Sequence, residues 1–157
     1  LLDQLEDGSA FAAVLNTESP RDDRQLIRRN AKEVARNLRR GVDRLTGLVD
    51  EVVVAGAFPV SATPEVQAMA EELDSATFDR LIEILDGIGA KVQRKLERRF
   101  AADESVVVLN LKAAWDRVDD PLFIDAVHPS SDTSRQWAEL MVPDLMQQLN
   151  SFGFSEG

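Results

Sequence analysis

The 157-residue sequence contains no cysteine and a single histidine, His128. The lack of cysteine excludes disulfide bonds, thiolate metal sites and cysteine nucleophiles. It does not indicate whether the protein belongs in an oxidising or a reducing compartment. No apolar run approaches the roughly 20 residues that a membrane-spanning helix needs. The first residues, LLDQLEDGSAFAAVL, also lack the basic and apolar regions of a signal peptide. We therefore expect neither a transmembrane segment nor a signal peptide in this sequence.

Positive charge is also scarce. Lysine and arginine number 18 against 28 aspartates and glutamates, which gives a formal net charge of -10. The electrostatic field of a protein with this net negative charge repels phosphates, so we expect no nucleic-acid partner. Basic residues do recur every four positions along one predicted helix, where a solvated helix face explains them better than a phosphate site. They are Arg28, Lys32, Arg36, Arg40 and Arg44.

The composition, 44% hydrophobic and 29% charged, is typical of one globular domain, and we assign residues 1–157 to a single domain. Apolar residues recur at helical spacing from Arg21 to about Val49 and again from Phe78 to Phe100, which predicts two long helices. Gly87 and Gly89 each weaken the second helix by about 1 kcal/mol relative to alanine. We therefore expect a bend or break at these glycines.

Two β-branched runs follow the predicted helices. Residues 52–54 are all valine, and residues 105–111 read SVVVLNL, so each predicts a strand buried on both faces. A short helix is expected after Pro64. The alternation of helix and strand predicts an α/β fold with parallel strands and helices on both sheet faces. Two strands make a poor sheet, so we expect further strands from another segment.

The only histidine lies in the loop after the second predicted strand, where functional groups gather in α/β folds. Asp125 precedes His128 by three residues, so its carboxylate can accept a hydrogen bond from Nδ1 and leave Nε2 as a general base. Pro129 biases His128 toward an extended backbone, and Ser130 or Ser131 can cap the next helix, which Pro143 should disturb. From spacing alone, an ordinary hydrogen-bonded loop histidine is the more common outcome.

The surrounding stretch FIDAVHPSSDTSRQWAELMVPDL resembles the last characteristic block of the SGNH, or GDSL-type, serine hydrolases, in which Asp-x-x-His-Pro precedes the C-terminal helix. A looser likeness of pattern covers residues 21–150. The resemblance implies a flavodoxin-like three-layer α/β/α sandwich, of which this chain supplies about two strands and the later helices. It also implies an esterase or lipase, with Asp125 and His128 as acid and base of a triad. The substrate would be a small-molecule or lipid ester, with no cofactor and no metal.

Two departures from the family qualify what the resemblance implies. Thr133 stands where the family usually has glycine, which puts the local turn in question. The Gly-Asp-Ser nucleophile motif and the oxyanion blocks are missing, and Asp7-Gly8-Ser9 has the letters in another order and follows no predicted strand. We therefore expect the serine on an N-terminal portion of the same domain that is absent or lies on another chain. The alternative is a non-catalytic α/β or helical interaction module with a vestigial Asp-His pair.

Overall fold

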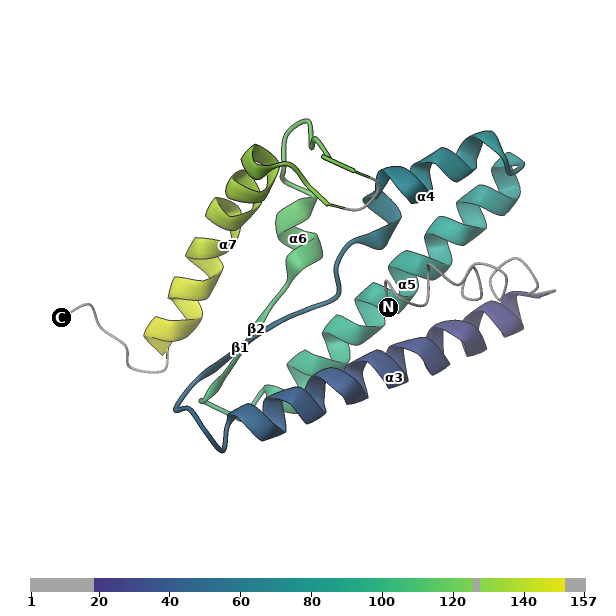
Figure 1. Cartoon of the computed structure of the whole chain (residues 1–157). Coiled ribbons are helices and arrows are strands. Elements are labelled where there is room, and N and C mark those ends of the chain that lie inside the picture. The colour runs from purple at the N-terminus through teal and green to yellow at the C-terminus, as the bar shows by residue number, and fades with distance from the viewer. Residues whose placement is uncertain (1–18, 126–127, 152–157) are drawn as a thin grey trace.

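A computed structural model describes residues 19–125 and 128–151 and shows a mixed α/β arrangement that is mostly helical (Figure 1). It confirms both long helices, both strands and the short helix after Pro64. The elements are α3 (Pro20–Leu45), β1 (Val52–Ala55), η1 (Val60–Ala62), α4 (Pro64–Ala68), η2 (Met69–Glu71), α5 (Ser75–Phe100), β2 (Val106–Leu109), α6 (Leu111–Trp115) and α7 (Ser131–Ser151).

Each of the two long helices is preceded by a side chain that accepts a hydrogen bond from a backbone amide of its first turn. Ser19 Oγ accepts a hydrogen bond from the Asp22 amide, with Pro20 at the first helical position of α3. At the start of α5, Asp74 Oδ1 accepts from the Thr77 amide at 3.0 Å. A two-pronged ion pair between Asp23 and Arg80, with Nη2 2.7 Å from Oδ1 and Nε 2.9 Å from Oδ2, joins the N-terminal parts of the two helices.

Of the bend or break expected in α5, the break is wrong, because the helix runs without interruption through both glycines. A Cβ placed on Gly87 would lie only 2.9 Å from Ile27 Cδ1 of α3. The missing side chain therefore lets α3 and α5 approach each other closely, and the packing offsets the weak helix propensity of glycine. The last helix, α7, likewise continues across Pro143 instead of ending there.

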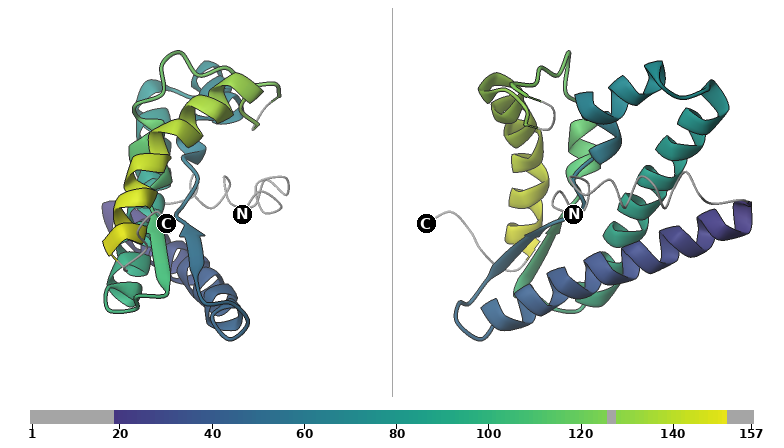
Figure 2. Two further views of the ribbon diagram at one scale, coloured as in Figure 1. Left: turned by 90° about the vertical axis from the view of Figure 1, so that its left-hand side faces the viewer. Right: turned by 45° about the vertical axis from the view of Figure 1, so that its right-hand side comes forward.

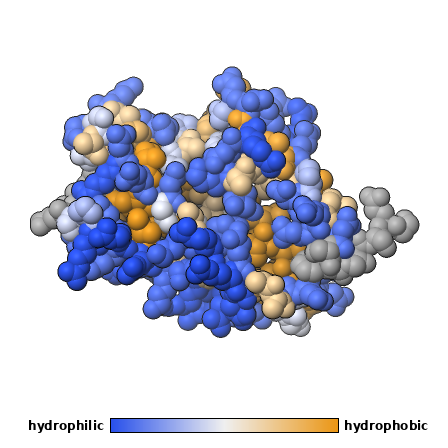
Figure 3. Space-filling model, turned by 180° about the vertical axis from the view of Figure 1, so that it is seen from behind, coloured by the Kyte–Doolittle hydropathy of each residue, from blue (hydrophilic) through white to orange (hydrophobic). Residues whose placement is uncertain are grey.

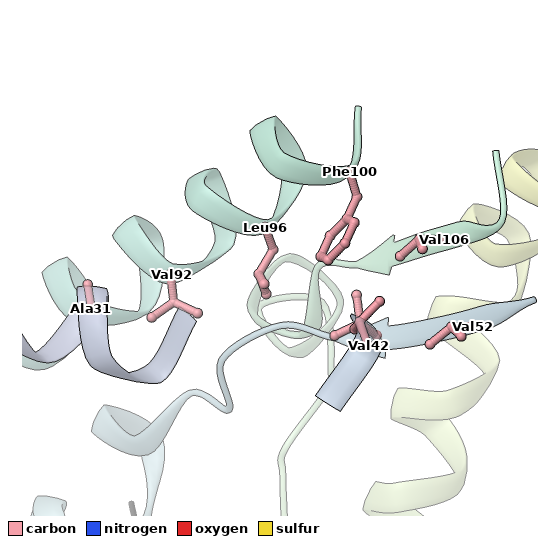
Figure 4. Packing of buried hydrophobic residues seen from close by; sticks show 8 residues of the cluster. Ala31, Val42, Val52, Val92, Leu96, Phe100 and Val106 are labelled. Atoms are coloured by element: carbon pink, nitrogen blue, oxygen red, sulfur yellow. The ribbon is translucent and has the colours of Figure 1, made fainter. Parts of the chain in front are cut away.

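The strands β1 and β2 pair in parallel, in a register that matches Val52 with Val106 and Ala55 with Leu109. One face of this two-stranded sheet packs against α3 and α5, which also contact each other (Figure 4). Side chains from all four elements interdigitate there. The buried cluster consists of Ala31, Val42, Val52, Val54, Val92, Leu96, Phe100 and Val106.

The opposite face of the sheet is covered over only one of its two strands. Helix α7 lies across the sheet from α3 and α5 and contacts β2, which buries Val107 and Leu109 (Figure 2). Val53 in β1 stays 49% exposed, and the residues of β1 alternate between buried and exposed. The expectation that both strands are buried on both faces is therefore wrong for β1, because α7 reaches only its neighbour.

Further apolar side chains reach the surface outside the buried cluster. Seen from behind, hydrophilic residues cover most of the molecule, and apolar residues show between them in separate patches (Figure 3). None of the described helices combines the length and the apolar character that crossing a membrane requires. The large exposed apolar residues are Leu45, Leu48, Val49, Val53, Leu122, Ile124 and Val142.

Candidate functional site

The loop that carries Asp125 and His128 lies at the end of the molecule toward which both strands point (Figure 1). It follows β2 and the short helix α6, and it leads directly into α7. Trp137 Nε1 of α7 donates a hydrogen bond to the Leu111 carbonyl at the start of α6, at 3.0 Å. This bond fixes the two helices on either side of the loop, so the loop sits beyond the carboxyl end of β2 as the sequence predicts.

The carboxylate of Asp125 holds His128 at two points. His128 Nδ1 lies 2.8 Å from Oδ2 and 3.0 Å from Oδ1, and the His128 backbone amide donates to Oδ1 at 2.8 Å. The hydrogen bond predicted from the three-residue spacing is thus confirmed. One carboxylate fixes both the backbone and the ring of the same residue, which restricts the rotation of the imidazole.

This contact determines which ring nitrogen is available. An ionised carboxylate can only accept hydrogen bonds, so it favours the neutral tautomer with the hydrogen on Nδ1 and the lone pair on Nε2. The side chains of His128 and Asp125 are 64% and 52% exposed. The imidazole is therefore not packed in the core, and it can meet a group that approaches from outside this part of the chain.

The base of the loop is closed by backbone and hydroxyl bonds. Phe123 and Pro129 form an antiparallel bridge, flanked by bonds from the Ile124 amide to the His128 carbonyl and from the Ser130 amide to the Leu122 carbonyl, at 2.9 and 2.8 Å. The loop is therefore a short hairpin. The His128 carbonyl takes part in its last described bond, and Asp125 directly follows Ile124.

The first turn of α7 anchors this hairpin. Ser130 Oγ accepts from the Thr133 amide at 3.2 Å and so caps the helix, as one of the two expected serines. Thr133 Oγ1 accepts from the Leu122 amide at 2.9 Å and lies 3.0 Å from Ser130 Oγ. The threonine that departs from the family's glycine is therefore part of the turn. Sequence reasoning noticed Thr133 only as a departure and missed this role.

Aromatic rings fill the space beneath the hairpin. Trp115 lies 5.0 Å from Trp137 and 5.6 Å from Phe123, measured between ring centroids, and Phe58 lies 5.5 Å from Trp137. Their tilted and edge-on arrangements are those that aromatic pairs favour. Trp115 and Trp137 could line an acyl pocket or belong to the core, and these contacts favour core packing. The contribution of Phe58, just after β1, was not anticipated.

The described residues also form a pocket away from the Asp-His loop. This pocket, of about 300 Å³, lies between the segment after β1, helix α5 and helix α6, and neither Asp125 nor His128 lines it. Lys112 lines this pocket and lies 2.9 Å from Asp116 and 3.9 Å from Asp86. The hydrogen bond to Asp116 holds the pKa of Lys112 above its usual value, so the lysine stays charged and paired.

The basic residues that recur every four positions have ordinary surroundings. Arg28, Lys32, Arg36, Arg40 and Arg44 are all exposed on α3. Within residues 19–125 and 128–151, no group of three or more acidic or histidine side chains is arranged to hold a metal ion.

Comparison of this chain with protein-family models, with curated proteins and with solved structures found no match. The Asp-x-x-His-Pro block and the geometry of the Asp125–His128 pair are therefore the features of this chain that point to a function.

Proposed function

We propose that this chain is part of an SGNH-type serine hydrolase that cleaves carboxylic esters, in which Asp125 and His128 are the acid and base of a catalytic triad. The observation that carries the proposal is the 2.8 Å contact between Asp125 Oδ2 and His128 Nδ1, on an exposed loop beyond the carboxyl end of a parallel strand. The contact orients the ring, and the His128 side chain is 64% exposed. This combination is what a general base requires.

In the proposed reaction, Nε2 takes the proton of a serine hydroxyl while the serine oxygen attacks the ester carbonyl carbon. The same proton then goes to the alkoxide that leaves. Water then attacks the carbonyl carbon of the acyl-serine that remains, and Nε2 takes its proton. Nε2 returns this proton to the serine oxygen as the bond to the acyl group breaks and the carboxylic acid leaves. Asp125 keeps the imidazole in the required tautomer and stabilises the imidazolium that forms at each step.

The serine is proposed to lie outside these 157 residues, on an N-terminal portion of the same domain. The described part of β1 supports this, because it pairs only with β2 and leaves its outer edge open. The amides of Val52 and Gly56 donate to the carbonyls of Ser105 and Leu109. Because amides alternate in direction along a strand, those of Val53 and Ala55 point to the outer edge of β1. A further strand paired there completes the sheet of a three-layer sandwich and places its own carboxyl end beside the Asp-His loop.

The test compares the 157-residue chain with the whole protein, meaning the polypeptide or complex that also contains the nucleophile. The whole protein is expected to react with a fluorophosphonate probe and to hydrolyse short aryl esters. His128→Ala should lower ester turnover by about 100-fold or more, and Asp125→Ala by the same amount or less. The 157-residue chain alone should do neither.

Three outcomes contradict the proposal. Full turnover by the His128→Ala protein refutes the role of the imidazole. Stoichiometric labelling of the 157-residue chain refutes an external nucleophile. A whole protein that neither reacts with the probe nor cleaves esters favours the non-catalytic interaction module.

A further inference from the structure

The Asp125–His128 pair has little packing of its own to hold it. Both side chains are more than half exposed, so their relative position depends on the backbone that carries them. That backbone is fixed where the hairpin closes, at Leu122 on the entering arm and Ser130 on the leaving arm. Asp125 follows Leu122 by three residues, and His128 precedes Ser130 by two. A displacement at the base therefore reaches both members of the pair.

One buried hydroxyl connects the two arms to α7. Thr133 is only 5% exposed, and its Oγ1 accepts from the Leu122 amide at 2.9 Å while lying 3.0 Å from Ser130 Oγ. Its own amide donates to Ser130 Oγ at 3.2 Å. The entering arm, the leaving arm and the first turn of the helix thus meet at one threonine. Because the site is buried, water is a poor substitute for the hydroxyl.

We propose that Thr133 is a positioning residue, whose hydroxyl holds the base of the hairpin so that Asp125 keeps His128 in the Nδ1-protonated tautomer. The proposal rests on the proposed hydrolase function for its effect on turnover. Its effect on the imidazole is independent of any activity. Thr133 touches neither substrate nor reacting atoms, and it acts only through the loop.

The test replaces the hydroxyl and keeps the shape. Thr133→Val removes Oγ1 and preserves the branched side chain, whereas Thr133→Ser retains the hydroxyl. Thr63→Val is a matched control, because Thr63 is also buried and caps a helix, α4, through its own hydroxyl. All three changes are made in the whole protein, and circular dichroism checks that each variant folds.

The main readout is the ¹⁵N spectrum of the His128 imidazole at a pH where the ring is neutral. Its signals are identified as those that vanish in His128→Gln. Thr133→Val should shift the ring from the Nδ1-protonated form toward a mixture of tautomers, while Thr133→Ser and Thr63→Val should match the unsubstituted protein. In ester hydrolysis, Thr133→Val should lower kcat about tenfold and leave KM within about twofold, because a misplaced base slows chemistry more than binding.

The outcomes separate this proposal from the hydrolase proposal. An unchanged imidazole spectrum in Thr133→Val overturns the positioning role, and so does an equal shift in Thr63→Val. A shifted spectrum in a protein without ester turnover supports the positioning role and counts against the hydrolase. Should Thr133→Val not fold, Ser130→Ala removes the other hydroxyl of the network and should shift the same signals less. A spectrum identical to that of the unsubstituted protein would then overturn the proposal.

Discussion

The two strands have almost the same sequence, VVVA in β1 and VVVL in β2, yet their surroundings differ. Val53 and Val107 are register partners on the same face of the sheet, and they are 49% and 3% exposed. Helices cover both faces of β2. Within the described residues, β1 has one covered face, one open face and one open edge.

This difference teaches that a run of valines specifies a strand without specifying what covers it. Both runs favour extended backbone because β-branched side chains fit a pleated surface. Coverage depends on which other elements reach the strand, and α7 reaches only β2. The open face of β1 is therefore the surface that the proposed N-terminal portion of the domain would cover.

The largest expected effect comes from placing a carboxylate at each of the two register partners. In the whole protein, Val107→Asp should destabilise by about 3–5 kcal/mol, because it buries an unpaired charge beneath α7. If another strand and its helices cover β1 as proposed, Val53→Asp should cost a comparable amount. Urea unfolding of both variants measures the two free energies.

The same two variants can also give different free energies of unfolding. A whole protein in which Val53→Asp costs less than about 0.5 kcal/mol, as at ordinary surface positions, would show that β1 stays open. The proposal that a further strand completes the sheet would then fail.

A smaller effect concerns the α3–α5 layer that covers the common face of both strands. Gly41→Ala in α3 should stabilise by about 0.5–1 kcal/mol, since nothing lies within 4 Å of the new Cβ and alanine favours the helix. Gly87→Ala should give little or none of this gain, because Ile27 Cδ1 at 2.9 Å must move away. Thermal unfolding of the two variants measures the difference. Equal stabilisation would show that the close approach of the helices is not needed.

The smallest effect is expected at the cap of α5. Hydrogen bonds from Thr77, first from its side chain and then from its amide, hold the pKa of Asp74 below its ordinary value of 3.8. Because the folded pKa is lowered, the carboxylate stabilises the fold above the unfolded value, and this contribution is lost as pH falls through the folded pKa. Asp74→Asn should slightly lower Tm at pH 7 and have no such effect well below pH 3. A constant difference in Tm between these pH values would contradict the assignment.

Much of the fold could be predicted because the relevant signals are local. Helical periodicity gives α3 and α5 within a few residues of their ends, and the valine runs give β1 and β2. The predicted break at Gly87 failed because helix propensity describes an isolated helix. The close approach of Ile27, 60 positions earlier in the sequence, is a tertiary contact that no local pattern contains.

In the candidate site, too, local contacts could be predicted from the sequence and tertiary contacts could not. The contact between Asp125 and His128 follows from a three-residue spacing and is present in the structure. The role of Thr133 depends on bonds to Leu122 and Ser130, which become neighbours only when the hairpin closes on α7. The serine, the ester substrate and the three-layer sandwich remain predictions.

The aromatic cluster beneath the hairpin has a spectroscopic consequence. The chain has two tryptophans and no tyrosine, and both indoles lie in this cluster, with ring centroids 5.0 Å apart and planes at 81°. Light absorbed near 290 nm is therefore absorbed in one place, between α6 and α7. The tryptophan fluorescence of these 157 residues therefore reports on the docking of α7 beneath the Asp-His loop, and α3 and α5 contribute no tryptophan to it.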